Sequence, residues 1–158
     1  TANCLIKFHT MLSVKQINRE EDLIDVSREE LINFLHTHLD RFRDTKEAIG
    51  KCLDYAFAKN CGKGGFVLTG YYEGRLAGAV IINKTGMEGY IPENILVYIA
   101  VDASIRGKGI GKQLMQEAIV RADGDVKLHV EYDNPAKRLY ERLGFTSKYA
   151  EMRFTKQK

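Results

Sequence analysis

Residues 106–114, RGKGIGKQL, combine three alternating glycines with three basic side chains. Glycine is a poor helix former, yet apolar residues at helical spacing follow, which indicates a turn that leads into a helix. The first N–H groups of a helix lack intrahelical partners and carry partial positive charge, and glycines let an anion approach them. Arg106, Lys108 and Lys112 add positive charge. The stretch therefore predicts a phosphate site, although a loop with incidental lysines would have the same composition.

Two common nucleotide-binding patterns do not fit this turn. The P-loop pattern requires a glycine where Arg106 stands and a Ser or Thr where Gln113 stands. The dinucleotide pattern GxGxxG fails because Lys112 or Leu114 takes the position of its third glycine. The turn does fit the pattern (Gln/Arg)-x-x-Gly-x-(Gly/Ala), from Arg106 to Gly111.

The elements that must position this turn are those of an α/β (α+β) domain. We expect strands over 12–17, 95–101, 126–132 and 149–155, and two more over 65–83 around Glu73-Gly74. We expect helices after a capping box at 27–30, after Thr45, after the glycine turn and after Asn134-Pro135. This order predicts one domain over 11–158 with a mixed sheet. Residues 1–10 are expected to be an appended segment or a loose extension.

The composition excludes several classes of protein. Of 158 residues, 44% are hydrophobic and 28% charged, and the net charge is +3, which is typical of a globular domain and argues against a nucleic-acid partner. The three cysteines show no disulfide or zinc spacing, so we expect no metal and a reduced, cytoplasmic setting. No apolar run is long enough for a membrane span.

A second motif lies downstream of the glycine turn. It covers residues 128–145, LHVEYDNPAKRLYERLGF. The first motif, with the stretch LVYIAVDASI before it, and this second motif occur in the order that is seen in one family. In both motifs the sequence resembles the GNAT superfamily of acetyl-CoA-dependent N-acetyltransferases, over about residues 65–155 and less closely over 11–60. The resemblance implies a mixed sheet of about six to seven strands flanked by about four helices, splayed between strands 95–101 and 126–132.

The resemblance assigns residues to acetyl-CoA, the acyl donor. The pantetheine arm would follow the first splayed strand and contact Asn134, which could also be a plain helix cap. The pyrophosphate would bind the N–H groups of the glycine turn, and Lys137 could meet the 3′-phosphate or lie on a solvated face. The implied cofactor-binding residues are Ile99, Ala100, Val101, Arg106, Gly107, Lys108, Gly109, Ile110, Gly111, Lys112, Asn134, Lys137 and Tyr140.

The resemblance also implies catalytic roles. Tyr140 matches the tyrosine that protonates the departing thiolate, and a phenol with an ordinary pKa of ~10 is protonated at neutral pH. Its helical spacing would equally suit a core aromatic. The general base could be His129, which lies where some relatives carry a glutamate, with Glu131 and Glu93 as alternatives, or a chain of waters. We expect no role for His36 or His38.

The expected reaction is direct transfer of acetyl to a primary amine, with a small molecule as the first candidate acceptor. A protein or peptide acceptor, or a non-catalytic coenzyme A-binding module, stays open. In relatives the acceptor pocket is formed by segments that correspond here to 39–46, 84–94 and 145–151, and Tyr90 and Tyr98 could line it. The apolar stretch YAEMRF, from Tyr149, could pair with a second copy in a homodimer.

Overall fold

The computed structural model describes residues 11–60 and 62–157. They form the strands β1 (Ser13–Ile17), β2 (Gly65–Tyr72), β3 (Arg75–Lys84), β4 (Asn94–Val101) and β5 (Val126–Leu128). The α-helices are α1 (Arg28–His38), α2 (Lys46–Phe57), α3 (Ile110–Arg121) and α4 (Lys137–Arg142), and the short 3₁₀ helices are η1 (Glu20–Asp22), η2 (Asp40–Phe42) and η3 (Ala103–Ile105). The strands form one sheet in the order β1-β2-β3-β4-β5, in which only β4 and β5 run parallel.

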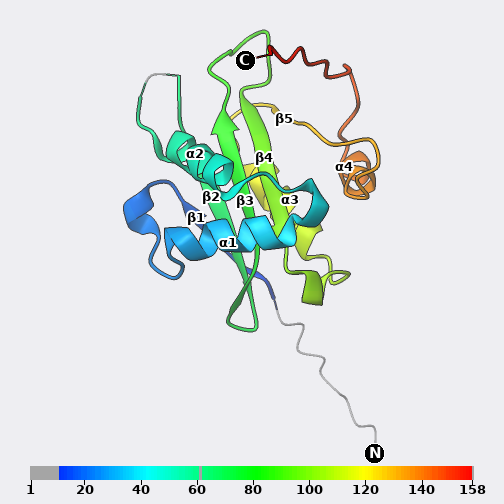
Figure 1. Cartoon of the computed structure of the whole chain (residues 1–158). Coiled ribbons are helices and arrows are strands. Elements are labelled where there is room, and N and C mark those ends of the chain that lie inside the picture. The colour runs from blue at the N-terminus through cyan, green and yellow to red at the C-terminus, as the bar shows by residue number, and fades with distance from the viewer. Residues whose placement is uncertain (1–10, 61, 158) are drawn as a thin grey trace, which may run out of the picture.

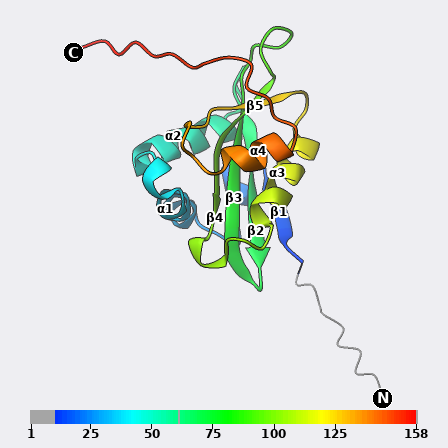
Figure 2. The same ribbon diagram turned by 90° about the vertical axis from the view of Figure 1, so that its right-hand side faces the viewer.

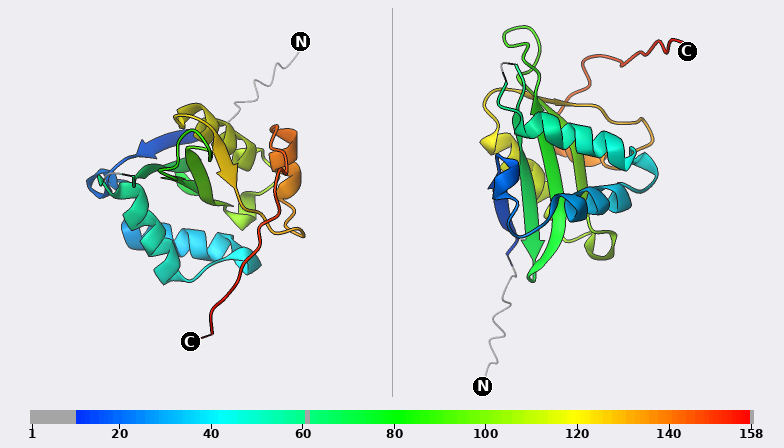
Figure 3. Two further views of the ribbon diagram at one scale, coloured as in Figure 1. Left: turned by 90° about the horizontal axis from the view of Figure 1, so that it is seen from above. Right: turned by 60° about the vertical axis from the view of Figure 1, so that its left-hand side comes forward.

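Helices cover both faces of this sheet, α1 and α2 on one side and α3 and α4 on the other (Figure 1, Figure 3). Side chains alternate along β3, so that Ala79 and Ile81 pack toward the first helix pair and Val80 and Ile82 toward the second. This gives two apolar cores, one on each face, as expected for an α/β domain.

Local signals in the sequence set several element boundaries. The hydroxyl of Ser27 accepts from the Glu30 N–H at 3.2 Å, and the Glu30 carboxylate accepts from the Ser27 N–H at 2.8 Å, so the predicted capping box is confirmed. These bonds lower the pKa of Glu30. Thr45 caps α2, as predicted. Glu73 and Gly74, with φ of 50° and 76°, form the predicted hairpin turn between β2 and β3.

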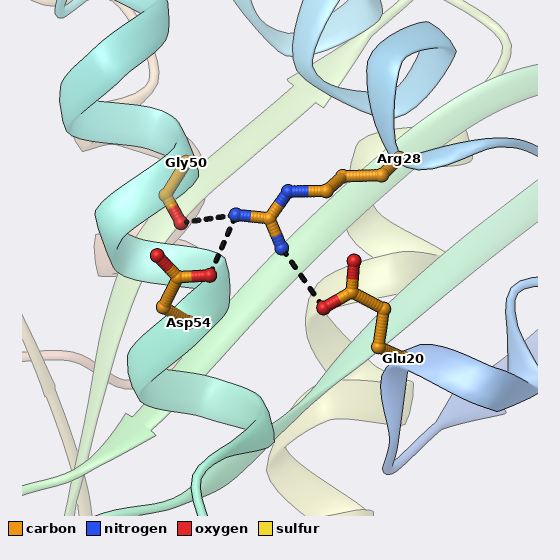
Figure 4. Close-up of polar contacts among 4 residues, drawn as sticks. All are labelled: Glu20, Arg28, Gly50 and Asp54. Atoms are coloured by element: carbon orange, nitrogen blue, oxygen red, sulfur yellow. Dashed lines mark hydrogen bonds and ion pairs between the residues drawn. The ribbon is translucent and has the colours of Figure 1, made fainter.

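The pair α1 and α2 is held together by Arg28 (Figure 4). Its guanidinium donates to the Gly50 carbonyl at 2.9 Å and to the Asp54 carboxylate at 2.7 Å, both on α2. Its other terminal nitrogen donates to Glu20 of η1 at 3.2 Å. Because the guanidinium is only partly exposed, these charge-assisted bonds tie together the two helices that flank the segment 39–45.

A bulge interrupts β4 near its middle. Ile81 of β3 pairs with Tyr98 and Ile82 pairs with Leu96, so Val97 is an extra residue on β4. As a result Val97 and Tyr98 both pack toward α1 and α2, and Ile99 packs toward α3 and α4. The bulge lies directly after the last pair between β4 and β5, Leu96 with Leu128.

Two sequence predictions about strands are wrong. The strand predicted over 126–132 ends at Leu128, because β4 and β5 pair over three residues only and then separate. The segment 149–155 forms no strand, because it has no neighbouring strand to pair with in the described chain. The sheet therefore has five strands, fewer than the six or seven predicted. The predictions for residues 1–10 lie outside the described residues.

Candidate active site

The two parallel strands diverge toward the carboxyl end of β4, as predicted. Pairing joins Asn94 to Val126 and ends at Leu96 and Leu128, whereas β4 continues to Val101. Beyond Leu96, β4 has no strand partner on its β5 side among the described residues. The backbone groups that face this side can bind an extended ligand that carries amides, although the Val101 carbonyl accepts from the Arg106 side chain at 3.4 Å.

At the end where β4 and β5 are still paired, residues at the start of β4 bind the turn that precedes β5. The Glu93 carboxylate accepts from the Asp125 N–H at 2.7 Å, and the Asn94 side chain donates to the Asp123 carbonyl at 2.7 Å. The N–H groups of Glu93 itself and of Asp125 hold the pKa of the Glu93 carboxyl below its ordinary value. Glu93 therefore anchors the turn between α3 and β5, at the end of β4 opposite to the glycine turn.

The glycine turn follows the open end of β4. Gly107 and Gly109 have φ of 83° and 78°, in the left-handed region that favours glycine, and a Cβ at either would meet no atom within 4 Å. Gly109 precedes α3 and supplies no side-chain cap. Among the described residues, none accepts from the six N–H groups of residues 107–112. Lys108 and Lys112 are exposed beside them, so the turn has the properties of an anion site.

Arg106 binds a neighbouring helix with its side chain. Its guanidinium donates to the His38 carbonyl at the end of α1 at 2.7 Å, and to the Val101 carbonyl at 3.4 Å. The His38 ring nitrogen Nδ1 accepts from the Ala103 N–H at 3.1 Å. Sequence reasoning gave His38 no role, and no sequence signal would have found one, because 65 residues separate it from Ala103. His38 and Arg106 thus hold the glycine turn against α1.

Tyr140 lies on α4 and is 7% exposed. Burial raises the pKa of its phenol to about 12, and no described residue hydrogen-bonds its hydroxyl group. Phe145 packs near it, with 6.1 Å between the ring centroids. A Cβ at Gly111 would lie 3.6 Å from Leu139, so α4 packs against the start of α3, beside the glycine turn. The phenol is thus a core side chain that keeps its proton at neutral pH.

The remaining predicted residues follow β5. Asn134 accepts from the Ala136 N–H at 2.9 Å through its side-chain oxygen, which leaves its amide nitrogen without a described acceptor. Lys137 lies 3.9 Å from Glu141 and 5.9 Å from the ring centroid of Tyr132. His129 and Glu131 are exposed in the irregular segment after β5, so they do not lie on a strand as the prediction for 126–132 had them.

The connection between α1 and α2 lies beside this opening. Arg41 forms an ion pair with Asp133 at 3.1 Å, which joins η2 to the segment after β5. The buried Tyr98 of β4 donates its hydroxyl to exposed Asp44 at 2.5 Å, and burial, more than this bond, raises the pKa of Tyr98. Tyr90, in contrast, is exposed. Neither pairing was predicted, because the partners are far apart in the sequence.

Together these features suit a ligand with an anionic end at the glycine turn and an extended arm along β4. Among the described residues, no three His, Cys, Asp or Glu side chains gather in a group that could hold a metal ion. The described helices include none that is long and apolar enough to cross a membrane.

Comparisons with known proteins agree with this geometry. The aminoglycoside N-acetyltransferase AAC(6′)-Iy in complex with CoA is 16% identical, with a TM-score of 0.67 over 97% of this chain and 99% of that chain. A putative acetyl transferase from Pyrococcus furiosus is 24% identical, with a TM-score of 0.59 over 90% and 99%. A ribosomal-protein-alanine N-acetyltransferase from Brucella melitensis biovar Abortus is 18% identical, with a TM-score of 0.58 over 92% and 99%. No curated protein sequence matches significantly.

These distant structures show the fold alone, so the assignment to a family comes from a family model. It describes the acetyltransferase (GNAT) family and matches residues 32–145, which include the glycine turn, the diverging strands and Tyr140. The protein belongs to the GNAT acetyltransferase family.

Proposed function

We propose that the protein transfers an acetyl group from acetyl-CoA to a primary amine on a small molecule, by direct attack in a ternary complex. One observation supports this most strongly: among the described residues, the edge of β4 beyond Leu96 has no strand partner and leads into six N–H groups that none of these residues accepts from, and α4, which carries Tyr140, packs against the start of α3 beside that turn. An anion site, an extended backbone edge and a neutral proton donor are what transfer from a phosphorylated thioester requires.

The chain offers groups for each part of acetyl-CoA, which supplies the activated thioester. The N–H groups of residues 107–112, with Lys108 and Lys112, would hold the pyrophosphate, and Arg106 would act through its backbone because its side chain binds His38. Ile99, Ala100 and Val101 would bind the pantetheine arm through their backbone, and Asn134 through its amide nitrogen. Lys137 would meet the 3′-phosphate.

Tyr140 would complete the transfer. When the amine nitrogen bonds to the thioester carbon, the carbon–sulfur bond breaks and the sulfur leaves with the electron pair. The Tyr140 hydroxyl would donate its proton to this sulfur. Because burial raises its pKa to about 12, the phenol holds a proton throughout the neutral range, and its hydroxyl has no competing partner among the described residues.

The incoming amine must lose protons, since alkyl amines are mostly protonated at neutral pH. We propose His129 as the base, with Glu131 or a water chain as the alternative. Imidazole titrates near neutral pH, and His129 is accessible to solvent. A His129→Gln variant tests this: loss of the acidic limb of the kcat/KM profile against pH supports His129, and an unchanged limb rejects it.

A small acceptor is favoured by the ion pair between Arg41 and Asp133. It joins the α1–α2 connection, which belongs to the expected acceptor pocket, to the segment after β5. The structural neighbours include enzymes that are named for aminoglycoside and for ribosomal-protein acceptors, so a protein or peptide acceptor is the second candidate. A module that binds coenzyme A without catalysis is the third.

Turnover with a panel of amines distinguishes these candidates. Polyamines, aminoglycosides, amino acids and peptides with free N-termini would each be incubated with acetyl-CoA, and free thiol would be measured. Thermal shift provides the binding control, because a ligand at 100 times its dissociation constant stabilises a fold by about 2.7 kcal/mol. Binding without turnover on any amine would support the non-catalytic module, and absence of binding would reject the proposal.

A further inference from the structure

Tyr98 lies in the part of β4 that has no partner strand on its β5 side among the described residues. Pairing with β5 ends at Leu96, and Val97 is the extra residue of the bulge. Without the bulge, alternation along β4 would turn the Tyr98 side chain toward α3 and α4. With the bulge, Tyr98 packs toward α1 and α2 instead. Figure 2 shows β4 between these two helix pairs. The bulge therefore aims the Tyr98 hydroxyl at the face opposite to the core that contains Tyr140.

The Tyr98 hydroxyl meets the carboxylate of Asp44 on that face. It donates to Oδ2 of Asp44 at 2.5 Å, and Asp44 itself is exposed. No other described residue donates to this carboxylate or forms an ion pair with it, because the nearby Arg41 pairs with Asp133 instead. One carboxylate oxygen is thus oriented by a buried hydroxyl, and the other is available for a charge-assisted bond to a cation.

The basic residues next to Asp44 in the sequence lie toward α1. The backbone is extended at Arg43 and at Thr45, so side chains alternate there and Asp44 points away from Arg43. Burial first, and then the charges of Arg43 and Lys46, lower the pKa of His36 on α1. Both cations therefore act on His36, whereas the Asp44 carboxylate faces β4.

One cation of the chain lies within the field of Asp44. The pKa of Arg153 is raised, chiefly by its bond to Glu151 and to a smaller extent by the charge of Asp44. Its guanidinium forms its ion pair with Glu151. An acceptor with a positive charge would therefore be attracted by Asp44 and would compete there with Arg153.

The distance between Asp44 and the reacting carbon suits an acceptor with two amines. In the proposed function the arm of acetyl-CoA follows β4 back from Val101 to Val97, which is roughly 13 Å at the rise of a strand. The thioester carbon would then lie near the backbone of β4 at the bulge. The Asp44 carboxylate lies one tyrosine side chain away from this backbone, so an ammonium bound to it is too far away to attack. A second amine a few carbons along the same molecule can reach the carbon.

We propose that Asp44 determines acceptor specificity by binding a second ammonium group, so that the protein acetylates diamines and polyamines in preference to monoamines. This inference rests on the proposed function, whose acceptor class it narrows. The ammonium at Asp44 keeps its protons, while the other nitrogen attacks as a neutral amine. Tyr98 is a positioning residue, because it orients the carboxylate and does not touch the acceptor.

A matched pair of amines tests the proposal. Diaminobutane and aminobutanol have the same carbon chain, and of the two the diamine alone carries a second ammonium group. The wild type should have about tenfold higher kcat/KM for diaminobutane. Asp44→Asn can still accept from Tyr98 but has no charge, so it should remove this preference, mainly by raising KM for the diamine. The kcat/KM for aminobutanol should stay within about twofold.

Asp123→Asn is the matched control. It removes the same charge from an exposed aspartate in the turn before β5, whose carbonyl accepts from the Asn94 side chain at the paired end of the two strands. The control should keep the full preference for the diamine. Circular dichroism would check that each variant is folded.

Two more variants separate orientation from charge. Tyr98→Phe keeps the Asp44 charge and removes the hydroxyl that orients it, so the preference should fall to about threefold. Arg153→Gln removes the competing cation, so KM should fall for diaminobutane and stay unchanged for aminobutanol.

The outcomes distinguish this inference from the proposed function. Equal kcat/KM for the two amines, or a preference that persists in Asp44→Asn, would overturn the inference and leave the proposed function standing. If a different polyamine of the panel is accepted, it is compared in the same way with its analogue in which a hydroxyl replaces the second amino group. Absence of turnover with every amine would overturn both.

Discussion

The role of Tyr140 can be tested by removing one oxygen atom. Tyr140→Phe keeps the ring that packs near Phe145 and deletes the hydroxyl group. If this group protonates the leaving thiolate, turnover should fall at least about tenfold, since general acids and bases contribute ~10²–10⁴. The affinity for coenzyme A, measured by calorimetry, should stay within about twofold.

The structure also predicts that this variant stays stable. The Tyr140 hydroxyl has no partner among the described residues, so its removal breaks no hydrogen bond there, and the free energy of unfolding should change by less than about 0.5 kcal/mol. Tyr98→Phe is the comparison, because it removes a bond to the Asp44 carboxylate and should destabilise by about 1.5–3 kcal/mol. The free energy of unfolding, measured with denaturant, would therefore distinguish Tyr140→Phe from Tyr98→Phe.

The dependence on pH gives a measurement that does not rely on activity. Because the pKa of Tyr140 is raised from 10.0 to about 12, the unfolded chain ionises first, and stability that is present below pH 10 is lost as pH rises. At pH 11 the unfolded phenol is mostly ionised and the folded phenol mostly neutral, so the wild type should lose on the order of 1 kcal/mol more stability than Tyr140→Phe between pH 8 and 11.

Two results would refute this reasoning. Turnover within twofold of the wild type would remove Tyr140 from the mechanism. Equal losses of stability for wild type and Tyr140→Phe between pH 8 and 11 would show that the phenol is not shielded from water.

Substitutions at three further positions test the residues that hold the glycine turn and the start of β4 in place. Gly109→Ala should strain the backbone by about 1–2 kcal/mol and weaken acetyl-CoA binding. Gly62→Ala, with φ of 80° in the loop between α2 and β2, should cause the same strain and leave binding unchanged in titration calorimetry. His38→Ala should weaken that binding about three- to tenfold by releasing the Ala103 N–H, and His38→Asn, whose side-chain oxygen can accept in place of Nδ1, should restore most of it. Glu93→Gln should lower Tm at pH 7. The difference in Tm between this variant and the wild type should shrink as pH falls, because a carboxylate with a lowered pKa stabilises the fold only while it is charged. The pH profile of turnover should not change.

The donor half of the site could be predicted from the sequence because its signals are local. Positive φ at Gly107 and Gly109, the start of α3 and the turn in which Asn134 accepts from the Ala136 N–H each depend on a few consecutive residues. The prediction of Asn134 as the N-cap of α4 is wrong, because the helix begins at Lys137 with Ala136 as its N-cap. The lengths of β5 and of the final strand could not be predicted in this way. An alternating pattern shows which face a strand would bury, but a neighbouring backbone decides whether the strand forms.

The side-chain pairings near the proposed acceptor site could not be predicted for a related reason, since they join distant segments. Arg41 with Asp133, and Asp44 with Tyr98, join the α1–α2 connection to residues more than fifty positions later.

His38 connects the two halves of the site. Its carbonyl and ring bind the residues around the glycine turn, while its helix leads into the α1–α2 connection. Arg28 in turn fixes α1 to α2. A shift of α1 caused by an acceptor would therefore reach the Ala103 N–H and the Arg106 guanidinium directly. Binding of the acceptor and binding of acetyl-CoA should for this reason be coupled. By linkage, the acceptor must change the affinity for acetyl-CoA by the same factor as acetyl-CoA changes the affinity for the acceptor. In His38→Ala this coupling should weaken, because the ring contact to the Ala103 N–H is lost and only the backbone contact to Arg106 remains. A mutation that only weakens the pyrophosphate site would lower acetyl-CoA affinity and leave the coupling factor intact.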